Sequence, residues 1–206
     1  MKTTTISFVR HGQVYNPQQL FYGRLPRFRL SEDGRHQAAA AANYLAAQPI
    51  YAVYTSPLLR ARQTAMPIAK RLQKEIHISS LLLESHTPYD GQPQTVMEQR
   101  NWDGYTGSPP QFEQPADIVR RIVQFIRQMR QRHEGEHVTA VSHGDPIAFT
   151  ALWAAAQPIS VAARRQLTQI GLPVNYPTHV GVLTLFFNGH AERPYQITYF
   201  DPTIHN

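Results

Sequence analysis

The sequence predicts an α/β fold, a three-layer sandwich in which helices cover both faces of a mostly parallel sheet. Two observations support this prediction. Short apolar runs alternate with helix-forming segments over residues 5–156, which is the order of a parallel sheet with crossover helices. Two β-rich runs at residues 180–187 and 195–200 then flank a turn at residues 188–190. We therefore expect an antiparallel hairpin at one edge of the sheet.

The first part of the chain contains two predicted strand–helix units and a third strand. Ser31 is a suitable N-cap for the first helix, and Glu32 and Asp33 suit the positive end of a helix. Pro57 suits the first turn of the second helix. In order, we expect a strand at 5–9, a loop at 10–30, a helix from 31 to 47, a strand at 51–55, a helix from 56 to about 73 and a short strand at 76–78.

Residues 85–114 are rich in Gly, Pro, Asp, Asn and Gln and have weak periodicity. Thirty such residues are too many for a plain connection, so we predict a lid or small insertion over the active site. An apolar stripe from Ile118 to Met129 then indicates a helix. A strand at 138–142 and a helix through Ala156 follow. With 206 residues, the chain 1–206 is most simply one domain that includes the lid.

Composition narrows the function classes. A hydrophobic content of 42% and a charged content of 17% are typical of a globular protein. The absence of cysteine excludes disulfides, thiolate catalysis and cysteine-bound metals. The sequence shows neither an apolar signal core nor the ~20 consecutive apolar residues of a membrane helix. We therefore expect a cytoplasmic protein with no membrane partner.

Arginine dominates the positive charge. The formal net charge is +6, and Lys2, Lys70 and Lys74 are the only lysines. The planar guanidinium group binds phosphate and carboxylate in a bidentate manner, which favours anionic ligands. Nucleic acid is one such ligand, but single-strand binding calls for aromatic residues interleaved with basic ones. Residues 195–200 contain no basic residue, so we do not expect a nucleic-acid partner.

A histidine follows each of two predicted strands. His11 comes after Arg10 at the end of the first strand, and His143 comes after Ser142 at the end of a strand more than a hundred residues later. In open α/β sheets, ligands bind at the carboxyl ends of the strands. We therefore expect one site that the parallel sheet assembles around both histidines.

Six short motifs stand in order along the chain. They are Arg10-His11-Gly12, Tyr22-Gly23-Arg24-Leu25-Pro26, Leu30-Ser31-Glu32-Asp33-Gly34, Ser56-Pro57-Leu58-Leu59-Arg60-Ala61-Arg62-Gln63-Thr64-Ala65, Leu83-Glu84 and Ser142-His143-Gly144. With these motifs, the chain resembles the histidine phosphatase superfamily, in its phosphoglycerate mutase-like branch, over residues 5–150. The resemblance is specific for the superfamily and says little about the substrate.

The resemblance implies hydrolysis of phosphomonoesters through a transient phosphohistidine. His11 would be the nucleophile, with its attacking ring nitrogen neutral. Arg10, Arg60 and His143 would bind the phosphoryl group, because phosphoryl transfer depends on stabilising the charge of the equatorial oxygens. Glu84 would be the general acid, and a nearby phosphate dianion favours its protonated form.

Further contacts are less well supported by the motifs. Asn16 and the backbone N–H of Gly144 are candidate phosphate ligands, as is Gln13. Asn16 lies four residues past Gly12, one fewer than in the typical mutase pattern, and Gln13 replaces the more frequent glutamate. In the predicted lid, four residues are candidates for contact with substrate: His86, Tyr89, Arg100 and Trp102.

We expect a metal-independent phosphatase with no cofactor. A metal bound to His11 would block the ring lone pair that a nucleophile needs, so we expect none at this site. The expected partner is a small phosphorylated metabolite, and the closing hairpin offers an edge for a homodimer. A mutase is the main alternative, but the chain is short for one and lacks the usual Gly-Trp-Glu-Gly run. A phosphate-binding regulatory protein without turnover is a second alternative.

Overall fold

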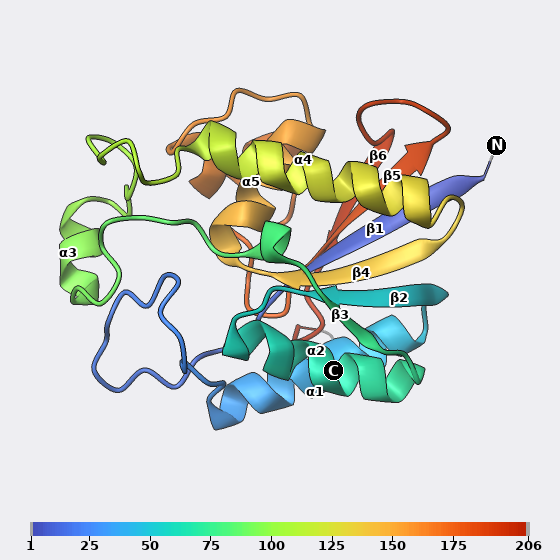
Figure 1. Cartoon of the computed structure of the whole chain (residues 1–206), viewed down its shortest axis with the longest axis horizontal. Helices are drawn as coiled ribbons and strands as arrows, with labels where there is room; N and C mark the ends of the chain where they lie inside the picture. The colour runs from blue at the N-terminus through green and yellow to red at the C-terminus, as the bar shows by residue number, and fades with distance from the viewer. Residues whose placement is uncertain (1, 205–206) are drawn as a thin grey trace.

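The computed structural model describes residues 2–204 and contains a six-stranded sheet with the strand order β3-β2-β4-β1-β5-β6 (Figure 1). The four strands from β3 to β1 run parallel, whereas β5 and β6 are antiparallel to their neighbours. The predicted α/β class with an antiparallel edge is confirmed. The strands are β1 (Thr3–Arg10), β2 (Ile50–Thr55), β3 (Ile76–Ile78), β4 (His137–Ser142), β5 (Val182–Asn188) and β6 (Gln196–Phe200).

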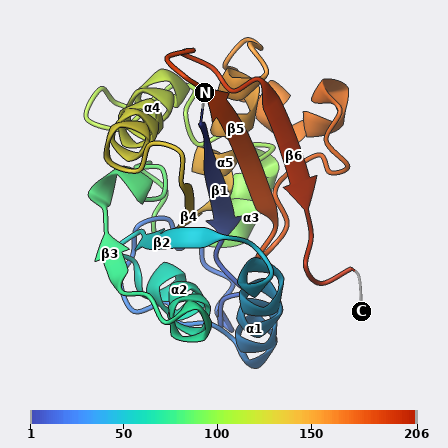
Figure 2. The same cartoon turned by 90° about the vertical axis from the view of Figure 1, so that its right-hand side faces the viewer.

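Helices cover both faces of this sheet, so the molecule has three layers (Figure 2). Helices α1 and α2 lie on one face, and α4 and α5 lie on the other. None of the helices within residues 2–204 has the length and apolar character needed to cross a membrane. The helices are α1 (Glu32–Ala46), α2 (Leu59–Leu72), α3 (Gln94–Gln99), α4 (Pro115–Arg132) and α5 (Gly144–Ala154), with short 3₁₀ helices η1 (Ser80–Leu82), η2 (Ala163–Arg165) and η3 (Leu167–Ile170).

The alternation of side chains along the central strand β1 fills both cores. Ile6 and Phe8 are fully buried against the layer of α4 and α5, whereas Val9 is buried against α1 and α2. Successive residues of a strand point to opposite faces of the sheet, so a strand buried on both sides reads as a nearly continuous apolar run. This double burial explains the apolar sequence that precedes Arg10.

Two helix starts show how local chemistry sets the element boundaries. Ser31 caps α1 as predicted, because its Oγ accepts a hydrogen bond of 3.0 Å from the backbone N–H of Gly34. The second helix begins at Leu59, so the predicted start at Ser56-Pro57 is wrong by three residues. The Ser56 hydroxyl instead forms a hydrogen bond of 2.8 Å with Nε2 of His143 at the sheet edge.

The hairpin between β5 and β6 forms where the sequence predicts it. A turn does form where it was predicted, with the N–H of Ala191 donating to the carbonyl of Asn188 over 3.2 Å. Pairing between the two strands resumes only at Tyr195, whose N–H donates to the carbonyl of Phe186 over 2.9 Å. Pro194 has no N–H to donate, so it delays the return to the ladder.

Two glycines fix the loop that follows the first strand. A Cβ on Gly34 would lie 2.0 Å from the carbonyl oxygen of Gln13, and a Cβ on Gly12 would lie 2.5 Å from the carbonyl oxygen of Gly34. Both distances are far too short for any side chain. The residue after His11 therefore packs directly against the first turn of α1, which holds His11 at the end of its strand.

Candidate active site

The two strand-end histidines lie side by side. Strands β1 and β4 are parallel neighbours in which Arg10 pairs with Ser142, so the next residues, His11 and His143, leave the sheet at the same edge. Their ring centroids are 5.2 Å apart. A phosphoryl group placed at one ring is therefore within reach of the other.

The His11 ring carries its lone pair at one defined nitrogen. Its Nδ1 lies 2.8 Å from the carbonyl oxygen of Gly12, and since a carbonyl only accepts, Nδ1 carries the proton. Burial lowers the pKa of His11 well below its usual value, and the charges of Arg60 and Arg10 lower it further. The ring is therefore neutral at neutral pH, with its lone pair on Nε2.

His143 is fully buried and has one nitrogen without a partner. Its Nε2 is bonded to the Ser56 hydroxyl, which itself accepts from the backbone N–H of Leu58 over 3.4 Å and can therefore donate its own proton to the ring. If the hydroxyl donates to Nε2, the ring proton of His143 lies on Nδ1. This nitrogen is buried and has no hydrogen-bond partner among the described residues. Burial and the charge of Arg60 lower the pKa of His143 well below its usual value.

Two arginines flank His11. Arg60 is fully buried in α2, donates through Nε to His11 Nε2 over 3.1 Å, and donates through Nη2 to the carbonyl of Gly23 over 2.6 Å. Arg10 donates through Nη1 to the carbonyl of Pro177 over 2.6 Å, while its buried Nε has no partner within residues 2–204. Buried polar nitrogens are normally paired, so the free nitrogens of Arg10 and His143 are well suited to phosphoryl oxygens.

Glu84 is a carboxylic acid in the same cavity wall as His11 and Arg10. It lies in the cavity wall, and its Oε1 accepts a hydrogen bond of 2.8 Å from the backbone N–H of Ser85. Burial and then the charge of Asp145 raise the pKa of Glu84 to about 7, against the opposing charges of Arg60 and Arg10. A carboxyl group with this pKa can hold a proton near neutral pH and release it to a leaving group.

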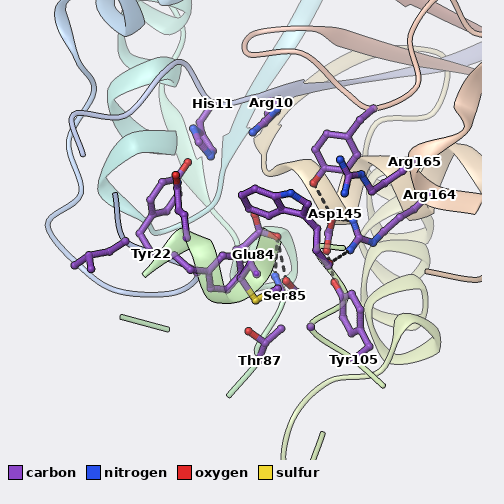
Figure 3. Close-up of a pocket in the computed structure, with 18 of the residues that line it drawn as sticks. Arg10, His11, Tyr22, Glu84, Ser85, Thr87, Tyr105, Asp145, Arg164 and Arg165 are labelled. Atoms are coloured by element: carbon purple, nitrogen blue, oxygen red, sulfur yellow. Dashed lines mark hydrogen bonds and ion pairs between the residues drawn. The ribbon is translucent and has the colours of Figure 1, made fainter. Parts of the chain in front are cut away.

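A cavity of about 400 Å³ opens in front of His11 (Figure 3). Arg10, His11 and Glu84 line it, whereas Arg60 and His143 contact His11 without lining it. Apolar side chains form much of the remaining wall, and they come from the loop after β1 and from residues 85–114. They are Leu20, Phe21, Met97 and Trp102.

A polar cluster that the sequence did not predict lies on one side of the cavity (Figure 3). Asp145 is its centre. Its Oδ1 accepts from the Tyr176 hydroxyl over 2.7 Å and lies 3.1 Å from Nη1 of Arg164, while its Oδ2 accepts from the Tyr105 hydroxyl. Arg164 also donates to the backbone carbonyl of Trp102. The cluster joins α5, residues 85–114 and η2 at one carboxylate.

The ends of the segment 85–114 meet at Glu113. Its carboxylate accepts from Nη2 of Arg24 over 2.7 Å, from Nε of Arg121 over 2.8 Å and from the backbone N–H of His86 over 2.9 Å. The N–H of Glu113 in turn donates to the carbonyl of His86 over 3.0 Å. Arg24 and Arg121 also donate to the carbonyl of Glu84, so the same pair of arginines holds the backbone at the general-acid candidate.

The other three predicted contacts, Asn16, Gln13 and Gly144, are not among the residues that line the cavity. Asn16 uses both ends of its amide on the backbone of Leu20 and does not line the cavity. Gln13 is exposed, and its side-chain oxygen accepts from the Ser31 hydroxyl over 3.3 Å. Gly144 is the first residue of α5, where the Tyr176 hydroxyl would lie 2.2 Å from an added Cβ.

Of the four candidates in the segment 85–114, Trp102 is the one that lines the cavity. His86 packs against Phe112, and Arg100 stacks on Tyr89. Trp102 has a left-handed backbone with φ of 59°, and its position is held by its carbonyl bond to Arg164. Left-handed backbone at a bulky residue is unfavourable and is concentrated at functional sites.

Sequence reasoning missed several wall residues for different reasons. Asp145 directly follows the motif Ser142-His143-Gly144. It could have been predicted as a site residue, because it falls in the first turn of a helix at the sheet edge. Arg164, Tyr176 and His179 come from an irregular region without periodicity, and no local pattern marked them.

Comparisons with known proteins agree with this geometry. A sequence profile of the histidine phosphatase superfamily (branch 1) matches residues 6–181. The chain is 37% identical to an uncharacterized protein of Mycobacterium tuberculosis over 155 residues, which cover 70% of this chain and 75% of that protein. It is 30% identical to phosphoserine phosphatase 1 of Hydrogenobacter thermophilus, over 68% of this chain and 70% of that protein.

Solved structures share the fold at lower identity. The structure of mycobacterial glucosyl-3-phosphoglycerate phosphatase superposes with a TM-score of 0.72 at 21% identity and covers 97% of both chains. The profile match extends over most of the chain, from the first strand through the second strand-end histidine and on to the start of β5. The chain belongs to the histidine phosphatase superfamily, in its branch 1.

Proposed function

We propose that the protein hydrolyses phosphomonoesters in two steps through a phosphohistidine on His11. The observation that carries this proposal is the neutral His11 Nε2 lone pair, held among Arg10, Arg60 and His143 at a cavity that also contains Glu84. The names of the relatives support phosphatase chemistry, since they include a phosphoserine phosphatase and a glucosyl-3-phosphoglycerate phosphatase. The substrate would be a small phosphorylated metabolite.

In the first step, His11 Nε2 attacks phosphorus and forms the N–P bond, while the bond from phosphorus to the leaving oxygen breaks. The leaving oxygen takes the proton of Glu84, and the product alcohol departs neutral. Arg60 donates to the attacking lone pair in the free enzyme, so its guanidinium must turn to an equatorial oxygen as phosphorus arrives. Arg10 and the Nδ1–H of His143 are the other donors for those oxygens.

In the second step, the Glu84 carboxylate removes a proton from water. The water oxygen attacks phosphorus, the N–P bond breaks, and phosphate leaves. His11 returns to its neutral form and Glu84 is protonated again, which completes the cycle. The same carboxyl group therefore acts first as acid and then as base, a role that suits its pKa of about 7.

Trapping the intermediate tests this proposal. The protein is mixed with ³²P-labelled phosphomonoester in EDTA, quenched in alkali to preserve phosphohistidine, and mapped by peptide analysis. We expect label on the peptide that contains His11. Label on another residue, or turnover that depends entirely on added Mg²⁺ or Zn²⁺, would contradict the proposed chemistry.

Replacing Glu84 separates substrates by their leaving groups. In Glu84→Gln, kcat/KM for an alkyl phosphate should fall by roughly 10²-fold or more, because the alkoxide departs unprotonated. The kcat/KM for p-nitrophenyl phosphate should fall by less than about tenfold, since nitrophenolate needs little protonation. Loss of the base should also make phosphohistidine accumulate with the aryl substrate. The exposed Glu134→Gln variant is the control, and equal losses on both substrates would count against an acid role.

A further inference from the structure

We propose that Asp145 is a positioning residue that acts through Glu84 and keeps the proton on that side chain until the leaving group takes it. The inference deepens the proposed phosphatase function and rests on it. Asp145 follows His143 by two residues, so the second strand end that brings a histidine to the site also brings this carboxylate.

The geometry holds the Asp145 side chain in one place. Three donors from three different segments converge on its two oxygens, namely the hydroxyls of Tyr105 and Tyr176 and the guanidinium of Arg164. The side chain of Arg164 is only 3% exposed and that of Asp145 is 14% exposed. Because both of its oxygens are bonded to these partners, the carboxylate keeps one orientation in the cavity wall.

All three partners donate hydrogen bonds, so they suit a carboxylate with two acceptor oxygens. Burial raises the pKa of Tyr105 and of Tyr176 well above the usual value, and the charge of Asp145 raises both further, so both hydroxyls keep their protons and donate. Burial opposes the charge of Arg164, but Asp145 outweighs it and the net shift raises the pKa of Arg164. An asparagine would offer one acceptor oxygen where the cluster uses two.

The negative charge of Asp145 counteracts the positive charges of the arginines that surround Glu84. Both carboxyl side chains line the same cavity, where Figure 3 shows them on neighbouring parts of the wall. The other charged or titratable groups that act on Glu84 come from every adjoining element. They are Arg10 of β1, Arg24 of the following loop, Arg60 of α2, Arg121 of α4, Arg164 of η2 and Tyr176.

These guanidinium groups alone would favour an ionised Glu84. Burial raises the pKa of Glu84 first, and the charge of Asp145 is the next largest contribution, larger than the opposing effect of Arg60. Glu84 is thus protonated below about pH 7 and loses its proton as the pH rises through that value. The first step should slow over the same range, and without the Asp145 charge that loss should begin at lower pH.

The test is the pH dependence of Asp145→Asn between pH 5 and 9. For an alkyl phosphate, the alkaline limb of kcat/KM should move down by about one pH unit, which is about a tenfold loss at pH 8. For p-nitrophenyl phosphate at the same pH, the loss should stay below about threefold, since that leaving group needs little protonation. Each substrate ionises in the same way whether the unmodified protein or Asp145→Asn is present. A difference between their pH profiles therefore reflects a group of the protein.

A second variant guards against misfolding. Asp145→Asn leaves Arg164 buried without its partner, so the double variant with Arg164→Gln replaces the ion pair by two neutral amides. We expect the alkaline limb to move down in this variant too, but by less than in Asp145→Asn, because the loss of Arg164 also removes an opposing positive charge near Glu84. The position should not change in the exposed control Asp33→Asn. A limb that stays in place, or equal losses on alkyl and aryl substrates, would overturn the role of Asp145. Failure to trap phosphate on His11 in the unmodified protein would instead remove the proposed function itself.

Discussion

His11→Ala should abolish phosphomonoesterase activity, with kcat lowered by on the order of 10⁴ or more, because a covalent route has no substitute for its nucleophile. The substitution removes the Nε2 lone pair and also the ring that bonds to Gly12 and Arg60. Initial rates with p-nitrophenyl phosphate measure the loss, since that substrate needs the least help from Glu84.

The exposed His36→Ala is a matched control and should retain full activity. Thermal unfolding of both variants shows whether the fold is kept, because removal of a buried ring leaves a cavity that lowers stability. A folded His11→Ala protein that turns over substrate at an appreciable rate would refute the assignment of the nucleophile.

Arg60→Gln should lower kcat/KM by about 10³-fold or more, the range over which an arginine stabilises a transferred phosphoryl group. Arg60 is the only guanidinium within residues 2–204 that is bonded directly to the attacking nitrogen, and its charge also helps keep His11 neutral. Glutamine keeps a donor in roughly the same place but lacks the positive charge and the planar fork of arginine. Inhibition by vanadate should weaken in parallel, because vanadate occupies the position of the phosphoryl group.

The neighbouring Arg62→Gln provides the control for this experiment. Arg62 lies on the same helix two residues later and is exposed, so its replacement should change kcat/KM by less than about threefold. If Arg60→Gln retained most of the activity while vanadate still bound tightly, Arg60 would be a structural residue of the buried layer and not a phosphoryl ligand.

The sheet and the pair of histidines were predictable because both follow from short-range patterns. An apolar run that ends in a polar motif marks a strand whose carboxyl end faces a site, and parallel neighbours bring such ends together. His11 and His143 are more than a hundred residues apart in sequence, yet they follow neighbouring parallel strands and lie at the same sheet edge. The position of Glu84 followed from the family resemblance, since an acid after a short strand carries little information by itself.

The rest of the site depends on contacts that no local pattern records. Arg164 reaches the cavity from an irregular region of 3₁₀ helices, and no sequence motif signals its ion pair with Asp145. Trp102 enters the wall because two successive residues, Asn101 and Trp102, adopt left-handed backbone that sequence propensity disfavours. The start of α2 differs from the predicted one because the Ser56 hydroxyl bonds to His143 at the sheet edge, and the helix begins at Leu59.

The closure of the segment 85–114 on Glu113 has a consequence for the evolution of such enzymes. Since His86 and Glu113 bind each other at the two ends, the chain enters and leaves the segment at one point of the scaffold. A change in the length of its interior would leave these two attachment points in place. Tyr105 and Trp102 tie that interior to Asp145 and Arg164, so a segment exchanged to alter the preference for substrate must still supply these contacts.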